Sequence, residues 1–207
     1  MTAPHDPSGV HPVIGVDAGT ATLREADHLI RDLTTTLALP PGTVACTHLI
    51  RTDARRGTAV SLELPDGGAA EEAWRRLTET ELGAALHDRR HGPSEAAALA
   101  AAEHTARRSG RAVLYAGVER LTGRVTVADL LETAIDQLTV VGAPLATPDP
   151  TTPVLTQNHV RPEWREGRLV LALVPAVGNT LAPFEVPNPT PCCADHSDQP
   201  RHAAGNS

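Results

Sequence analysis

Lysine is absent from this sequence of 207 residues, so all 18 basic residues are arginines. Lysine chemistry is thereby excluded, including Schiff-base catalysis and the phosphate-binding lysines of nucleotide enzymes. Aromatic residues make up only 2% of the chain, although hydrophobic residues make up 41%. A hydrophobic core is therefore expected to consist mainly of leucine, valine and alanine.

Further absences limit the class of protein. The net charge of −7 provides no basic excess for a nucleic-acid backbone, so no nucleic-acid partner is expected. No run of 18 apolar residues occurs, so we expect neither a membrane span nor a membrane partner. The N-terminal stretch lacks the basic and apolar regions of a signal peptide, and three cysteines do not suggest a disulfide framework. We therefore expect a soluble cytoplasmic protein, either monomeric or homo-oligomeric.

The order of apolar runs and turn signals predicts an α/β fold over residues 12–142. A short apolar strand at 13–16 leads to an amphipathic helix at 23–37, where Thr22 and Glu25 form a capping-box pattern. Strands alternating with helices favour a small layered sheet covered by helices. The other expected elements are strands at 43–52, 58–64, 112–118 and 138–141, helices after Gly68 and Ser94, and a strand running into a helix at 125–135.

The composition changes in the C-terminal part, because 11 of the 18 prolines lie beyond residue 142. We expect extended or β structure there, with a strand at 168–174 and a partner at 181–186 across a Gly178-Asn179 turn. The expected organisation has four parts: a flexible arm at 1–11, an α/β domain at 12–142, a Pro-rich segment at 143–190 and a mobile Cys/His tail at 191–207.

Residues 13–22, VIGVDAGTAT, are an apolar run followed by Asp, Gly and Thr. This pattern resembles the first phosphate loop of actin-like ATPases, in which a second strand follows the turn. Here an amphipathic helix follows, so we interpret the motif as a strand-to-helix turn in which Gly19 supplies backbone freedom. A ligand at this turn would be bound by backbone amides and Thr20 rather than by a metal on Asp17.

The Cys192-Cys193-Ala-Asp-His196 sequence is the strongest candidate for a metal site. Thiolate and imidazole ligands suit zinc, but adjacent cysteines rarely bind one tetrahedral ion together. Such a site would need Cys46, His48 or a second protomer to complete it. The alternatives are a loose tail with two accessible thiols and a vicinal disulfide formed under oxidation.

Other histidines and cysteines have simpler interpretations. Cys46 and His48 are expected on one face of a strand, where a nucleophilic pair competes with a buried cysteine beside an ordinary histidine. His87 and His91 could share a helix face and a metal, but the Gly-Pro that follows favours a solvated polar loop. Carboxylates of a ligand could be received by arginines near a strand end: Arg51, Arg55 and Arg56.

Several pieces of the chain resemble one family. The first strand VIGVDAG, the segment LALPPGTVACTHLIRTDA, the helix GPSEAAALAAA and the strand RVTVAD occur in the order found in the cobalamin-biosynthesis CbiG C-terminal (CobE-like) domain. The resemblance covers residues 12–129, although the family's Lys-Ala-Asp-Glu motif is here TDARRG, without lysine. It implies a role in corrin-ring maturation, with these residues nearest the site: Gly15, Gly19, Asp53 and Ser94.

Three hypotheses on function follow. The first is a protein that binds or acts on a polycarboxylated tetrapyrrole, whose acidic groups the clustered arginines would bind. The second is a metal-binding or redox-responsive module that uses Cys192, Cys193 and His196. The third is a non-enzymatic interaction module whose Pro-rich C-terminal half docks a partner. The sequence leaves open whether the protein is an enzyme.

Overall fold

The computed structural model describes residues 11–52, 56–143 and 147–187 and shows the expected mixed α/β fold. The first half of the chain forms β1 (Val13–Asp17), α1 (Leu23–Thr36), β2 (Val44–Arg51), β3 (Arg56–Glu63), α2 (Gly67–Leu77) and β4 (Gly83–Leu86). Strand β3 pairs with β1 and β2, and β4 pairs with β1, all antiparallel. This β-α-β-β-α-β sequence with strand order β4-β1-β3-β2 is the split β-α-β arrangement of ferredoxin-like sheets.

Helices α1 and α2 pack on one face of this sheet. Ile14 and Val16 of β1 share a buried cluster with Ile30 of α1 and Trp74 of α2. Helix α1 begins where the sequence predicts, because the Thr22 side chain accepts from the Glu25 N–H and the Glu25 carboxylate accepts from the Thr22 N–H.

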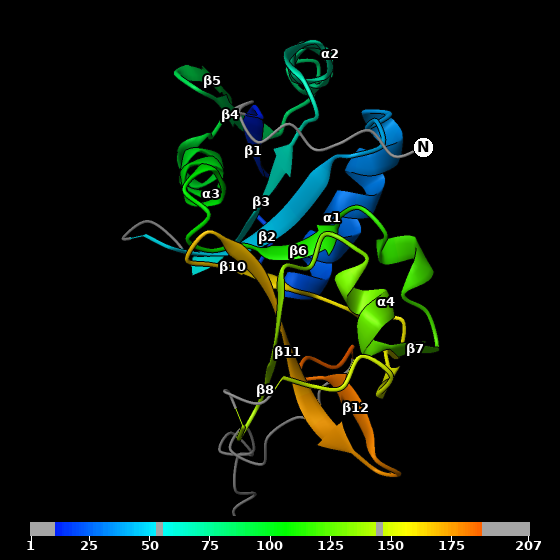
Figure 1. Ribbon diagram of the computed structural model, residues 1–207. Coiled ribbons are helices and arrows are strands. Elements are labelled where there is room, and N and C mark those ends of the chain that lie inside the picture. The colour runs from blue at the N-terminus through cyan, green and yellow to red at the C-terminus, as the bar shows by residue number, and fades with distance from the viewer. Residues whose placement is uncertain (1–10, 53–55, 144–146, 188–207) are drawn as a thin grey trace, which may run out of the picture.

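Helix α3 (Glu95–Thr105) packs on the opposite face of the sheet, as Figure 1 shows. Alternate residues of a strand point to opposite faces, so Gly15 faces away from the core that holds Ile14 and Val16. A Cβ atom at Gly15 would lie 1.8 Å from the Ala97 carbonyl oxygen of α3. The absence of a side chain at Gly15 therefore allows α3 to lie directly on β1.

Substitution Gly15→Ala is expected to lower the free energy of unfolding by at least about 3 kcal/mol, because helix or strand must move to relieve the overlap. Gly67→Ala is the matched control, since nothing lies within 4 Å of a Cβ at Gly67. Urea denaturation followed by circular dichroism measures both. A Gly15→Ala protein as stable as the Gly67→Ala protein would contradict this packing.

The second half of the chain extends the same sheet. It comprises β5 (Arg89–His91), β6 (Arg111–Leu114), the 3-10 helix η1 (Val118–Arg120), β7 (Arg124–Thr126), α4 (Val127–Leu131), β8 (Gln137–Val140), β9 (Pro153–Leu155), β10 (Glu163–Arg165), β11 (Arg168–Ala176) and β12 (Thr180–Pro183). Strand β6 pairs with β2 and β10, and Figure 1 shows β11 running from there into the lower part of the molecule. Strands β8 and β12 both pair with β11 over a second core that contains Leu130 and Leu171.

The expected β11–β12 hairpin is present, with Gly178 and Asn179 at positive φ in its loop. The segment around His87–His91 differs from the expected polar loop, because Arg89–His91 pair with Ala84–Leu86 as a hairpin. His87, at φ 53°, lies in the turn of this hairpin. Strand β5 begins with two arginines, so its sequence has no alternation of apolar and polar residues that would indicate a strand. Among the described residues, no helix is both long and apolar enough to cross a membrane.

Candidate functional site

A groove of about 880 Å³ lies between α1 and the chain that leaves β12, and we call it the α1 groove. Arg24, His28 and Arg31 line it from α1, where the i, i+4, i+7 spacing places them on one helix face. Both arginines are exposed, and neither has an acidic partner among the described residues. Arg31 Nη1 lies 3.3 Å from His28 Nδ1. This wall is therefore cationic and available to an anion.

Arg111 of β6 lies at the floor of the groove, with a side chain only 8% exposed. Its Nη1 donates to Asp27 Oδ1 at 2.6 Å, and its Nε donates to Glu185 Oε2 at 2.6 Å. Burial alone would lower the pKa of Arg111, but the hydrogen bonds to Glu185 and Asp27 outweigh it and raise this pKa. The floor thus holds a permanently charged guanidinium between two carboxylates.

The loop before β10 supplies His159 to the lining of the groove and Arg161 as a second partner of Asp27. His159 Nε2 lies 2.8 Å from Glu185 Oε1, and Arg161 Nε donates to Asp27 Oδ2 at 3.4 Å. Tyr115 anchors this loop, because its hydroxyl donates to the Val160 carbonyl at 3.2 Å. This hydrogen bond holds the loop, and with it His159 and Arg161, close to β6.

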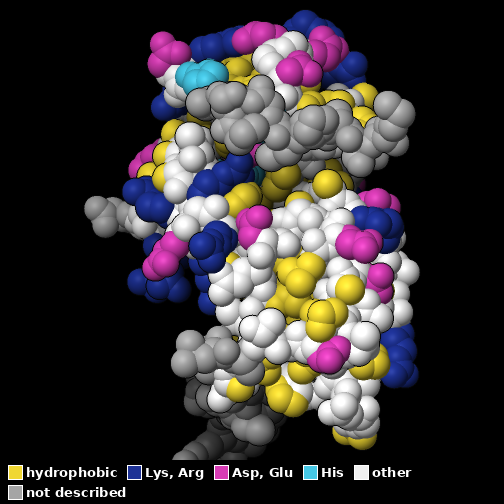
Figure 2. All heavy atoms as spheres, viewed as in Figure 1, with side chains coloured by type: hydrophobic (Ala, Val, Ile, Leu, Met, Phe, Trp, Pro, Cys, Tyr) yellow, Lys and Arg dark blue, Asp and Glu magenta, His cyan; other side chains and the backbone are white. Residues whose placement is uncertain are grey.

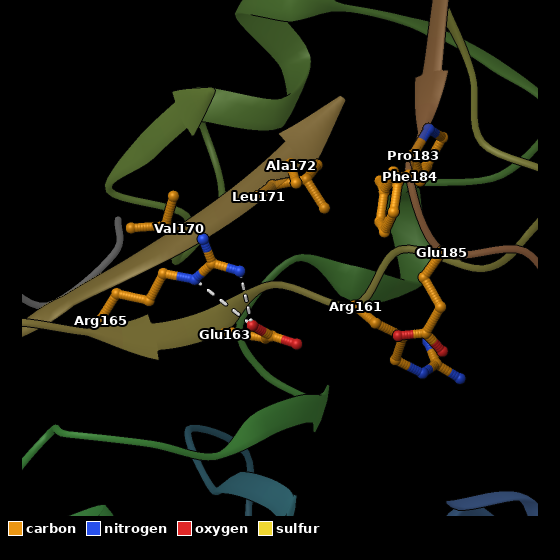
Figure 3. Close-up of a pocket in the computed structure, with 9 residues that line it drawn as sticks. All are labelled: Arg161, Glu163, Arg165, Val170, Leu171, Ala172, Pro183, Phe184 and Glu185. Carbon is orange, nitrogen blue, oxygen red and sulfur yellow. Dashed lines mark hydrogen bonds and ion pairs between the residues drawn. The ribbon is translucent and has the colours of Figure 1, made fainter. Parts of the chain in front are cut away.

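The opposite wall of the groove is mainly apolar and consists of Phe184, Val186 and Pro187 around Glu185. Phe184 is 62% exposed and Val186 is 38% exposed. The same segment borders a smaller cavity of about 180 Å³ on its other side, drawn in Figure 3. There Phe184 stands beside Pro183, and Glu185 and Arg161 line the same cavity (Figure 3).

Figure 2 shows a second collection of arginine side chains at the left, beside β10. Arg108, Arg165 and Arg168 line a hollow of about 680 Å³ there. Arg108 donates to Glu103 at 2.7 Å and Arg165 donates to Glu163 at 2.8 Å. Arg168 donates to the Gln137 side chain at 3.2 Å, and Glu166 also lines the hollow. Because two of the three arginines already have acidic partners and a further carboxylate lies in the lining, this hollow is a weaker anion site than the α1 groove.

A buried polar chain connects β2, β3 and α3. His48 Nε2 and His104 Nδ1 each lie 2.7 Å from Ser61 Oγ, and Arg107 Nη2 lies 2.7 Å from Glu63 Oε2. His104 Nε2 lies 3.3 Å from the same carboxylate oxygen. Burial raises the pKa of Glu63, but hydrogen bonds from His104 and Arg107 outweigh it and bring this pKa down to about 2.

Arg107 Nη1 also lies 3.2 Å from His104 Nε2, so the imidazole is held between the Glu63 carboxylate and the Arg107 guanidinium. Ser61 Oγ links it to His48 on the other side. Ser61 and His104 are 0% exposed, which keeps any substrate away from the hydroxyl. This chain therefore fastens α3 to the sheet. Cys46 is also 0% exposed, and burial raises the pKa of its thiol, as expected of a structural cysteine.

Four of the residues that the sequence singled out have packing or turn contacts outside these grooves. Gly15 lies under Ala97, and Gly19 at φ 69° donates its N–H to Asp17 Oδ1 at 2.9 Å. Thr20 Oγ1 lies 2.7 Å from Thr58 Oγ1. Ser94 occupies the N-cap position of α3, where its side chain makes no capping hydrogen bond. Their role toward a ligand stays a prediction.

The other candidate residues, Asp53, Cys192, Cys193 and His196, lie outside the described residues. Within the described part of the chain, no group of three or more His, Cys, Asp or Glu side chains is placed to hold a metal ion. The zinc hypothesis stays a prediction that concerns the tail.

Sequence reasoning overlooked the α1 groove. The one local signal was the spacing of Arg24, His28 and Arg31, which marks a cationic helix face. Arg111, His159 and Glu185 carried no signal, because they meet only when β6, a loop and the end of β12 come together.

Comparison with known proteins adds no relative to this picture, since no family model, curated protein or solved structure matches the chain. A ferredoxin-like strand order supports many unrelated activities, so the argument on function rests on the groove and its residues.

Proposed function

We propose that the protein binds a small ligand with several carboxylates in the α1 groove, and that this ligand is a polycarboxylated tetrapyrrole. The observation that carries the proposal is the pair of exposed arginines, Arg24 and Arg31, which lack acidic partners among the described residues and face a buried Arg111. Guanidinium groups bind carboxylates in a two-pronged, charge-assisted geometry.

The two walls of the groove match the two kinds of surface on such a ligand. The α1 wall supplies cations for acidic side chains, while Leu23, Phe184 and Val186 supply apolar surface for the macrocycle. The resemblance of residues 12–129 to a cobalamin-biosynthesis domain supports the tetrapyrrole as the ligand class. The proposed role is binding, and a catalytic step is not part of it.

Titration with cobyrinic acid, a corrin whose acidic side chains are free, tests this proposal by calorimetry and by the corrin absorption band. Saturable binding is expected. The double variant Arg24→Ala/Arg31→Ala is expected to bind roughly tenfold more weakly, because two charge-assisted contacts are removed. Arg75→Ala/Arg76→Ala is the matched control, since it removes the same charge from α2, away from the groove.

Cobinamide, in which the corrin carboxylates are amides, is the ligand control and is expected to bind more weakly than cobyrinic acid. Absence of cobyrinic acid binding at high micromolar concentration would refute the proposal. Equal loss of affinity in the Arg24/Arg31 and Arg75/Arg76 variants would show that net charge, not the groove, attracts the ligand.

A further inference from the structure

Glu185 is held in the α1 groove in the manner of a bound carboxylate ligand. Its two oxygens accept from the Nε and Nη2 groups along one edge of Arg111, which is the two-pronged geometry by which arginine recognises carboxylates. His159 Nε2 lies 2.8 Å from Oε1 on another side. These groups of the groove contact a carboxylate that belongs to the chain itself.

The charged side chains around Arg111 leave a place for one negative charge at the position of the Glu185 carboxylate. Asp27 interacts with both Arg111 and Arg161, so these three side chains together carry one net positive charge. Glu185 neutralises it. Burial raises the pKa of Glu185, but the hydrogen bonds from Arg111 and His159 outweigh it and lower this pKa. Without Glu185, the Nε edge of a buried guanidinium would require another anion.

The segment that carries Glu185 is otherwise loosely attached to the described residues. Its last backbone hydrogen bond there runs from Phe184 N–H to the Ala172 carbonyl at 2.9 Å. The neighbours Phe184 and Val186 are exposed, and cavities lie on both sides of the segment. The Glu185 carboxylate is therefore the main attachment of residues 185–187 to the groove.

From these contacts we infer that Glu185 occupies the position of a ligand carboxylate, so the segment after β12 competes with the ligand for Arg111 and His159. This inference rests on the proposed function for the identity of the ligand. The carboxylate receptor itself consists of Arg111 Nε and Nη2 with His159 Nε2. A ligand carboxylate enters it by displacing Glu185 and carries the segment 184–187 away from the groove.

Substitution Glu185→Ala tests the receptor without any tetrapyrrole. Acetate corresponds to the group that this substitution deletes. It is expected to raise the melting temperature of Glu185→Ala by much more than it raises the melting temperature of the unchanged protein. Acetamide and sodium chloride at matched ionic strength are the controls, because neither supplies a carboxylate. An equal effect of acetate on both proteins would overturn the inference, whatever the outcome with cobyrinic acid.

Affinity for cobyrinic acid tests the competition. Removal of the internal carboxylate is expected to tighten binding by roughly tenfold in Glu185→Ala, because the ligand no longer displaces a bound group. Glu185→Gln keeps the size of the side chain and preserves folding if Glu185→Ala does not fold, and it is expected to tighten binding roughly threefold. Unchanged or weaker binding in both variants, with binding by the unchanged protein intact, would overturn the competition.

The two proposals fail in different ways. Selective stabilisation of Glu185→Ala by acetate, with no cobyrinic acid binding by any form, would keep the receptor and remove the tetrapyrrole as its ligand. Cobyrinic acid binding that is unaffected by acetate and by both Glu185 variants would keep the proposed function and remove the role of Glu185.

Discussion

Acidification from pH 7 to pH 4 is expected to lower the free energy of unfolding by about 3 kcal/mol through His48 alone. Burial, together with the smaller effect of nearby His104, lowers the pKa of His48 from 6.5 to about 3 in the folded protein. Between these two pH values the unfolded state holds a proton that the folded state lacks, so stability falls as the pH falls. Burial also lowers the pKa of His104, so His104 likewise contributes a loss of stability as the pH falls.

Substitution His48→Gln isolates this effect, because a glutamine amide can still donate to Ser61 Oγ but does not titrate. The variant is expected to be less sensitive to pH between 6.5 and 4 than the unchanged protein, as measured by urea denaturation at several pH values. His28→Gln, on the exposed face of α1, is the matched control and should keep the full dependence. Identical pH dependence in the His48 variant would refute the assignment.

Removal of Arg111 is expected to destabilise the fold by about 3 kcal/mol, because the buried Asp27 and the partly buried Glu185 are left without their shared partner. Arg111→Leu measures this effect in urea denaturation. The triple variant Arg111→Leu/Asp27→Asn/Glu185→Gln should recover part of the loss, since no uncompensated charge then remains in the groove.

Arg165→Leu is the matched control for Arg111. Its partner Glu163 lies 2.8 Å away, but both side chains are about half exposed, so a loss below about 1 kcal/mol is expected. Similar decreases in the free energy of unfolding for Arg111→Leu and Arg165→Leu would show that burial of the Arg111 cluster contributes little to stability. A triple variant less stable than Arg111→Leu alone would show that the carboxylates have other essential contacts.

Local elements of the fold followed from local signals. The α1 helix, its Thr22–Glu25 capping box and the β11–β12 hairpin were all predicted, because caps, periodic apolar residues and Gly-Asn turns act between near neighbours in the chain. The β4–β5 hairpin was not predicted, because the arginines of β5 conceal a strand that exists only through its pairing with β4.

Gly15 shows the same difference between what local sequence indicates and what tertiary packing requires. The sequence marked Gly15 as a position near a ligand, on the basis of a family resemblance, and that role stays a prediction. The structure adds a reason of its own for a glycine here, since the backbone of α3 lies where a Cβ would be. Only the three-dimensional approach of a helix to a strand reveals such a requirement.

The sequence by itself determined the class of fold and the leucine-, valine- and alanine-rich core, since each depends on composition or on spacing along a few turns of chain. The tertiary structure alone decided where a carboxylate can bind. Arg111 lies 84 residues from Asp27 and 74 residues from Glu185, and only strand pairing brings them together. Contacts over such separations depend on the packing of whole elements, which no local pattern encodes.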